Sequence, residues 1–250
     1  LDEYFRYKKE FVILNGHSNV GKTTMVLYMI VNSAIQHGWK WAIYSSENQT
    51  ASVKMELMQF AMNKKVTDMN YFERKMAYEW VQEHFVVINN SQVYSYSDII
   101  LFMEKIMRQR GLDGIFVDPY NSLKLDIGNS SITPHDYHYE AASEFLTFSN
   151  AEDTEGGGKF VNRCDCFVTI HRKVQSPDHS IRKMTEFHVR KVRVTETGGR
   201  PTPLEEPYRM TMNLSHTGFT SWTGQKPLFK TLSFNESEKQ MPLNTSFLKS

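Results

Sequence analysis

Apolar residues along the first half of the chain recur with two different periods. Short apolar runs predict buried strands at 11–14, 39–46, 85–88 and 114–118. Segments with apolar residues every three or four positions predict helices at 24–36, from 50, at 68–82 and from 97. Gly38 should stop the first helix, and Thr50 and Ser97 should act as N-caps. Strands that alternate with helices in this way form a largely parallel sheet covered by helices.

The pattern changes in the second half of the chain. Runs at 166–172, 186–194 and 208–212 read as strands joined by turns, which suggests antiparallel strands added to one edge of the sheet. A helix expected at 135–149 is not followed by the apolar strand that a parallel sheet requires. Either the loop wraps without a strand, or residues are missing between about Ser149 and Glu152. We favour the second interpretation.

The segment from Gly16 to Thr23 matches the pattern G-x-x-x-x-G-K-[ST] at every fixed position, between a predicted strand and a predicted helix. Such a loop points backbone N–H groups at phosphate oxygens, with the helix N-terminus behind them. Lys22 would reach the β- and γ-phosphates, and the Thr23 hydroxyl would bind Mg²⁺. A chance glycine-rich turn is the alternative. The residues expected to hold ATP or another nucleoside triphosphate are Gly16, Ser18, Asn19, Val20, Gly21, Lys22, Thr23 and Thr24.

Two carboxylates are candidates for the remaining nucleotide chemistry. Asp118 ends an apolar strand, where phosphate-loop enzymes place an Asp that holds Mg²⁺ directly or through water. The alternative is a solvated Asp at a strand end. Glu47 follows the second predicted strand, where a carboxylate can orient or deprotonate the attacking water. The alternative is a surface Glu in a loop.

A basic pair lies on a late predicted strand. Strand alternation places Lys191 and Arg193 on one face, with Val192 and Val194 on the other. The pair is either a charged edge that opposes aggregation or a pair of cations that reaches another subunit's γ-phosphate, as an arginine finger does.

Composition bounds the class of protein. Among 250 residues, 40% are apolar and 23% are charged, which describes a soluble globular chain. The net charge of +1 excludes a wholly basic surface, so a nucleic-acid contact would need a local patch. No apolar run approaches the roughly 18–20 residues that cross a bilayer, so no membrane partner is expected. The chain opens so close to its first strand that we expect a fragment.

The two cysteines, Cys164 and Cys166, share a face of one strand and are poorly placed to bond each other. Two ligands alone do not make a zinc site. We therefore expect reduced thiols and a cytoplasmic location.

Taken in order, these motifs resemble the RecA-like ATPase domain of hexameric replicative DNA helicases, a family that includes bacterial DnaB, bacteriophage primase-helicases and mitochondrial Twinkle. The similar segments, within roughly residues 9–200, are Gly16–Thr24, Tyr44–Asn48, Phe116–Leu123, Arg163–Arg172 and Lys191–Arg193 with Gly199. The resemblance implies an α/β RecA-like core over residues 1–218, with a mostly parallel sheet and extra antiparallel strands. Residues 219–250 would be an extension that packs on a neighbour or forms an arm.

The resemblance also implies roles for the residues. Lys22 and Glu47 would be catalytic with Lys191 and Arg193, the last two acting in trans, and Thr23 and Asp118 would hold Mg²⁺. ATP would lie between copies in a ring, with a hexamer expected. Loops at 124–136 and 152–159 would grip single-stranded DNA, although the second is equally well explained as a surface linker.

The resemblance to this family predicts an ATP-dependent replicative helicase motor, with primase as a candidate partner and a bacterial or bacteriophage setting. One departure is the family's sensor strand, usually ending in Gln or His, which would fall near Asn150 where no strand is predicted. Two alternatives stay open: a recombinase-like filament ATPase, and a nucleotide-binding assembly protein with little hydrolysis.

Overall fold

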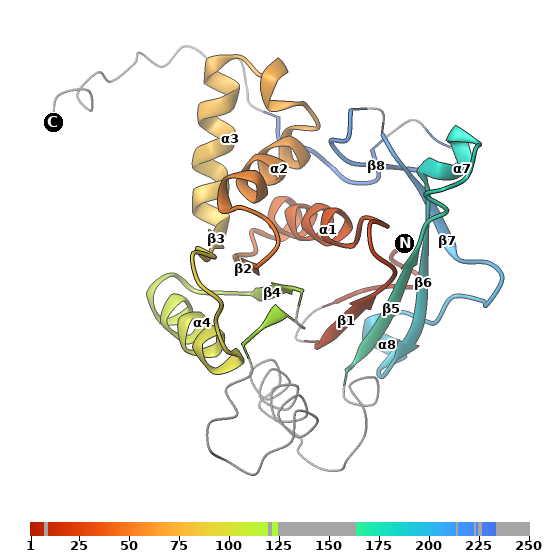
Figure 1. Ribbon diagram of the computed structural model, residues 1–250, viewed down its shortest axis with the longest axis horizontal. Helices are drawn as coiled ribbons and strands as arrows, with labels where there is room; N and C mark the ends of the chain where they lie inside the picture. The colour runs from red at the N-terminus through yellow and green to blue at the C-terminus, as the bar shows by residue number, and fades with distance from the viewer. Residues whose placement is uncertain are drawn as a thin grey trace, which may run out of the picture.

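Two sheets on either side of a central helix organise the chain (Figure 1). The computed structural model describes residues 1–7, 10–119, 122–124, 164–213, 215–222, 224 and 227–233. The central helix is α1 (Lys22–His37), which begins directly after the glycine-rich loop and ends at Gly38 in the left-handed conformation, as predicted.

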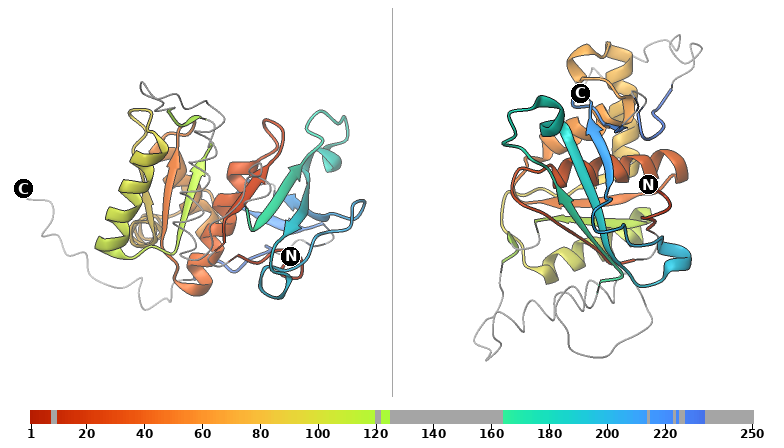
Figure 2. Two further views of the ribbon diagram at one scale, coloured as in Figure 1. Left: turned by 90° about the horizontal axis from the view of Figure 1, so that it is seen from below. Right: turned by 90° about the vertical axis from the view of Figure 1, so that its right-hand side faces the viewer.

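The first sheet has three parallel strands in the order β3-β2-β4. Their bounds are β2 Trp41–Ser45, β3 Phe85–Val87 and β4 Gly114–Asp118. Every residue of β2 is buried, because both faces of this central strand are covered. Trp41 and Ile43 face the cluster built on α1, whereas Ala42 and Tyr44 face α4 (Tyr96–Arg110). Figure 2 shows α4 on the outer side of this sheet.

The second sheet has five strands in the order β1-β5-β6-β7-β8. Their bounds are β1 Val12–Asn15, β5 Cys166–His171, β6 Met184–Val192, β7 Tyr208–Met212 and β8 Phe219–Ser221. Strands β1 and β5 are parallel, and the later strands are antiparallel. The expected α/β class, with a parallel core and antiparallel strands at the C-terminal edge, is therefore confirmed.

Helix boundaries correct two expected caps. In α2 (Thr50–Met62) the cap is Gln49, so Thr50 is already helical. In α4 the cap is Ser95, not Ser97, because Ser95 and Asp98 form a reciprocal capping box. The remaining helices are η1 Val66–Asp68, α3 Tyr71–His84, α7 His179–Lys183 and α8 Thr195–Gly198.

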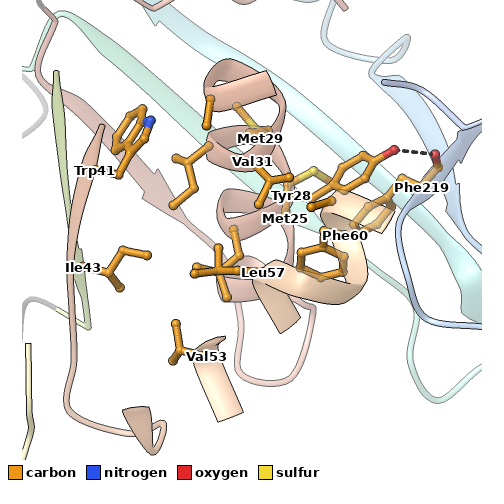
Figure 3. Close-up of a cluster of buried hydrophobic side chains, with 14 of the residues drawn as sticks. Met25, Tyr28, Met29, Val31, Trp41, Ile43, Val53, Leu57, Phe60 and Phe219 are labelled. Atoms are coloured by element: carbon orange, nitrogen blue, oxygen red, sulfur yellow. Dashed lines mark hydrogen bonds between the residues drawn. The ribbon is translucent and has the colours of Figure 1, made fainter. Parts of the chain in front are cut away.

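One apolar cluster joins the two sheets through α1. It contains Ile43 of β2 and Val168 of β5 together with Met25 and Leu27 of α1, all nearly inaccessible to solvent. Figure 3 shows the part of this cluster between β2, α1 and α2, where the Tyr28 hydroxyl donates to the Phe219 carbonyl over 3.1 Å. Burial of several large side chains, at about 1.5–3 kcal/mol each, holds the sheets in a fixed relation.

The two sheets divide between β1 and β4. Among the described strands, β4 pairs only with β2, and β1 pairs only with β5. The helix expected at 135–149, and the missing strand inferred near Asn150, lie outside the described residues and stay predictions.

The described residues after 218 pack against the rest of the chain. Strand β8 completes the edge of the larger sheet, and the Leu232 N–H donates to the Ala61 carbonyl over 2.8 Å. This stretch packs on its own chain rather than standing away from it. No helix in the described part of the chain is long and apolar enough to cross a membrane.

Candidate nucleotide-binding site

The glycine-rich loop leaves the end of β1 and crosses over β5. A Cβ atom on Gly16 would lie 2.5 Å from the Ile170 carbonyl oxygen, so only glycine fits this crossing. Asn19 and Gly21 have positive φ values of 63° and 91°, which turn the chain into α1. Buried Val20 anchors the loop in the core. The loop thus has the strand–turn–helix geometry that its motif requires.

Lys22 and its neighbours line the inside of this loop. The Lys22 ammonium donates to the carbonyl oxygens of Gly16 and His17, at 2.9 and 2.8 Å. Ser18 is exposed, and Thr24 lies half-buried in the first turn of α1. The loop therefore offers a cation and a helix N-terminus on one concave surface, which suits a phosphate group.

Asp118 meets the loop from the other sheet. The Thr23 hydroxyl donates to a carboxylate oxygen of Asp118 over 2.6 Å, which links α1 to the end of β4. The pKa of the Asp118 carboxyl is raised above its usual value, mainly by burial and also by the nearby charge of Glu47. The hydrogen bond from Thr23 and the charge of Lys22 act in the opposite direction. A hydroxyl and a carboxylate side by side are oxygen ligands of the kind that Mg²⁺ prefers, so the residues fit that ion.

Glu47 reaches the same place through strand pairing. Because Ser45 of β2 is paired with Asp118 of β4, Glu47 follows two residues beyond that pair. The Ser46 N–H donates to the Asp118 carbonyl over 3.0 Å, and Asn48 donates to the Ser45 hydroxyl over 3.0 Å. The Glu47 side chain is exposed, and its charge acts on Asp118. The structure thus brings Lys22, Thr23, Asp118 and Glu47 together.

Lys191 and Arg193 are not part of this group. They lie at and just beyond the end of β6, where Val192 is paired with Cys166, at the start of β5. The start of β5 is in turn paired with Val12, at the start of β1. Strand β1 therefore separates the basic pair from the loop by about 10 Å at 3.3 Å per residue.

Arg172 also lies close to the loop, although it is not among the site residues predicted from the sequence. Its position directly after an apolar strand is the only feature of the sequence that points to it. A guanidinium nitrogen of Arg172 would lie 3.7 Å from a Cβ atom on Gly21, and its Nε is buried without a hydrogen-bond partner among the described residues. Parallel pairing of β1 with β5 brings both strand ends to one edge of the sheet. This guanidinium adds positive charge next to the start of α1.

A cavity of about 460 Å³ opens beside the loop, and no motif in the sequence predicts it. Its lining residues are Asn15–His17, Thr169–His171, Glu186, His188 and Arg190. His171 lies 3.1 Å from the Glu186 carboxylate. Burial acts to raise the pKa of Glu186, but hydrogen bonds from His171 and Arg209 outweigh it and hold that pKa below its usual range. These residues come from separate strands, so no spacing in the sequence signals them.

The cysteines are buried and free, as expected. Burial raises the pKa of Cys164, and raises the pKa of Cys166 to about 12, so both are thiols at neutral pH. Within the described ranges, no three His, Cys, Asp or Glu side chains gather as a metal site.

The expected DNA-binding loops fall almost wholly outside the described residues. Of the segment 124–136, only Lys124 is described; its backbone N–H donates to the Tyr94 carbonyl over 2.8 Å, and its side chain is exposed. The segment 152–159 is not described. Both assignments stay predictions.

The fold is that of the RecA-like α/β domains, and comparison with solved structures places it among them. One solved ATPase domain has a TM-score of 0.68 at 12% identity, with 86% of each chain covered. A second solved structure is that of a DnaB-like replicative helicase, described together with its interactions with primase. It has a TM-score of 0.63 at 11% identity, over 85% of this chain and 57% of that chain. A KaiC-like protein of Pyrococcus horikoshii has a TM-score of 0.56 at 12% identity over 86% and 89% of the two chains.

Sequence comparison points the same way. The chain is 24% identical over 224 residues to a chloroplastic and mitochondrial Twinkle homologue of Arabidopsis thaliana. The matched region covers 74% of this chain and 31% of that homologue. The chain therefore spans about a third of that relative's length. No protein-family model matches. The resemblance to helicase ATPase domains is thus confirmed for the fold.

Proposed function

We propose that this chain is the motor domain of a replicative DNA helicase, which hydrolyses ATP between copies and moves along single-stranded DNA. The observation that carries the proposal is the convergence of Lys22, Thr23, Asp118 and Glu47 where α1, β4 and β2 meet. This set combines a phosphate cradle, oxygen ligands and a general base, as phosphoryl transfer to water requires.

Each residue has a separate role in this proposal. Loop N–H groups and Lys22 would hold the triphosphate, and Thr23 and Asp118 would hold Mg²⁺. The ion, when bound, would neutralise charge on the β- and γ-phosphate oxygens. Glu47, exposed and beyond the end of β2, orients the attacking water and accepts its proton. Arg172 lies beside the start of α1 and contributes charge to the same cradle.

The basic pair completes the site from a neighbouring copy. Lys191 and Arg193 lie across β5 from the start of β1, so the length of that strand separates them from the loop of their own copy. Placed against the loop of the next copy, they would stabilise charge on the transferring phosphoryl group. Such a head-to-tail contact repeats around a ring, and a hexamer is the assembly that the helicase resemblance favours.

DNA and partner proteins follow from the same proposal. Single-stranded DNA would pass through the ring and be gripped by its backbone, which a chain of net charge +1 can do through a local polar or basic patch. The similarity to a DnaB-like helicase studied with primase supports primase as a candidate partner. A bacterial or bacteriophage-infected cytoplasm is the setting we propose.

The test is ATP turnover by the full-length protein with and without single-stranded DNA, together with unwinding of a forked duplex. We expect DNA to stimulate turnover and ATP to drive unwinding. A protein that turns over ATP at the same rate with and without DNA, and leaves the fork intact, would contradict the motor proposal.

A recombinase-like filament ATPase is the second candidate, since head-to-tail contacts that do not close into a ring build open filaments. Electron microscopy with ATP and single-stranded DNA separates the two. Closed rings support the helicase, and coated strands support the filament. Nucleotide binding without turnover would instead support an assembly protein.

A further inference from the structure

The Arg193 side chain is held by a carboxylate that has its own backbone anchor. Asp165 lies just before β5 and is largely buried. One of its carboxylate oxygens accepts the Phe11 N–H over 2.8 Å, and the other lies 2.8 Å from a terminal nitrogen of Arg193. The Asp165 carboxylate is therefore fixed in orientation before it meets the guanidinium.

The backbones of the same residues are also joined. The Asp165 N–H donates to the Phe11 carbonyl over 2.9 Å, and the Arg193 N–H donates to the Asp165 carbonyl over 2.7 Å. The neighbouring cation is held in parallel, since the Lys191 ammonium donates to the Cys164 carbonyl over 2.8 Å. Two successive residues before β5 thus hold Lys191, near the end of β6, and Arg193, just beyond it.

A second aspartate, Asp113, makes the same two hydrogen bonds to a backbone but forms no ion pair with an arginine among the described residues. Asp113, just before β4, accepts the Lys40 N–H over 2.8 Å with its carboxylate, and its own N–H donates to the Lys40 carbonyl over 2.8 Å. This is the arrangement of Asp165 with Phe11, repeated in the smaller sheet. The ion pair with an arginine distinguishes Asp165 from it.

We propose that Asp165 is a positioning residue, which holds the Arg193 guanidinium in the orientation that it presents to the nucleotide site of a neighbouring copy. The proposal rests on the trans role in the proposed function. The Arg193 side chain is 42% exposed while that of Asp165 is 10% exposed, so a buried anchor holds an accessible cation. An arginine side chain loses rotamer freedom when it is fixed. An anchor within its own chain lowers that cost at assembly.

The first test is Asp165→Asn, with Asp113→Asn as the matched control. The asparagine keeps an oxygen for the Phe11 N–H but loses the ion pair with Arg193. A misplaced group costs up to about 10²-fold in rate, so we expect kcat for ATP to fall by about 10- to 100-fold with KM changed less than about twofold. Asp113→Asn should keep the wild-type kcat. Turnover of Asp165→Asn that is unchanged or increased would overturn the proposal.

A mixing experiment separates positioning from a folding defect. Copies carrying Asp165→Asn retain a normal loop, and copies carrying Lys22→Ala retain a normal Arg193. In a random mixture, about a quarter of head-to-tail contacts would combine the two normal halves. Turnover above the sum of the separate samples supports positioning, and no gain overturns it.

The same mixture made with Arg193→Ala distinguishes the two levels of failure. A gain with Arg193→Ala but not with Asp165→Asn overturns the positioning role alone. No gain in either mixture overturns the trans role itself, and positioning with it. If Asp165→Asn melts below the assay temperature, Arg193→Lys replaces it, because lysine keeps the charge but not the fork geometry. Wild-type turnover by that variant would contradict the need for a held guanidinium.

Discussion

The two ends of strand β1 present opposite chemistry. At the end that carries the loop, carboxylates of Glu47 and Asp118 lie beside a cradle suited to phosphate. At the other end, Lys191 and Arg193 are held by a carbonyl and a carboxylate at the start of β5. One end can bind a nucleotide and activate water, and the other can supply positive charge.

Under the proposed function, neither end is a whole catalytic site. The ends point away from each other along one strand, so one copy cannot bring them together. A second copy can, if its basic end docks against the loop end of the first. The oligomer is then part of the chemistry, and the following changes test each end in turn, from the largest expected effect to the smallest.

Replacing Lys22 with alanine should do the most damage, because it removes the cation of the phosphate cradle. We expect ATP turnover to fall to background, a loss of more than about 10³-fold, together with weaker nucleotide binding. Fluorescent-nucleotide titration and phosphate release measure the two effects. Lys105→Ala, on the outer helix α4, is the control and should behave as wild type.

Arg193→Ala should reduce ATP turnover without weakening nucleotide binding, and so should distinguish the roles of the two ends. Loss of an arginine finger costs about 10³-fold or more in turnover, yet the loop that binds the nucleotide is untouched. We therefore expect nucleotide affinity within about twofold of wild type. Arg108→Ala removes an exposed arginine that pairs with Glu104 and should change neither quantity. Normal turnover by Arg193→Ala would rule out the trans role.

Glu47→Gln should stop chemistry at the loop end while the nucleotide stays bound. Removal of a general base costs about 10²–10⁴-fold in kcat. Glu79→Gln on α3, an exposed carboxylate, is the control. Single-turnover measurements report the chemical step directly, and a variant that retains wild-type chemistry would show that Glu47 is only a surface residue.

The smallest effect concerns Glu10, near the basic end. Burial, with the nearby Asp165 charge, raises the pKa of Glu10 from 4.5 to about 7. The folded state therefore holds this proton more tightly than the unfolded state, and the stability it contributes below about pH 4.5 is lost as the pH rises through about 7. Because the group is partly exposed, Glu10→Gln should gain no more than about 1 kcal/mol at pH 8.

Urea unfolding at pH 5 and pH 8 measures this difference. The gain from Glu10→Gln should be larger at pH 8 than at pH 5. An equal effect at both pH values would contradict the raised pKa.

Much of the loop end was predictable from the sequence, because its chemistry is local. The residues from Gly16 to Thr23 follow one another, and Asp118 and Glu47 fall at or just beyond the ends of apolar strands. Parallel strands bring such ends together, so the pattern alone predicts a meeting of the three segments.

The basic end was predictable only in part. The identity of Lys191 and Arg193 was visible, but their partners depend on the register of β6 against β5, which is irregular at Phe167 and Val168. Alternation gives faces and not registers, so the pair of Asp165 with Arg193 could not be derived from spacing. The cavity beside the loop was hidden for the same reason, since its residues come from three strands.

The most direct test of the central claim is the mixture of Lys22→Ala with Arg193→Ala copies of the full-length protein. Each variant alone should be inactive, for lack of a different half of the site. A site shared between copies predicts ATP turnover in the mixture well above the sum of the separate samples. If the mixture stays as inactive as its components although mixed assemblies form, the two ends of β1 do not belong to one catalytic site.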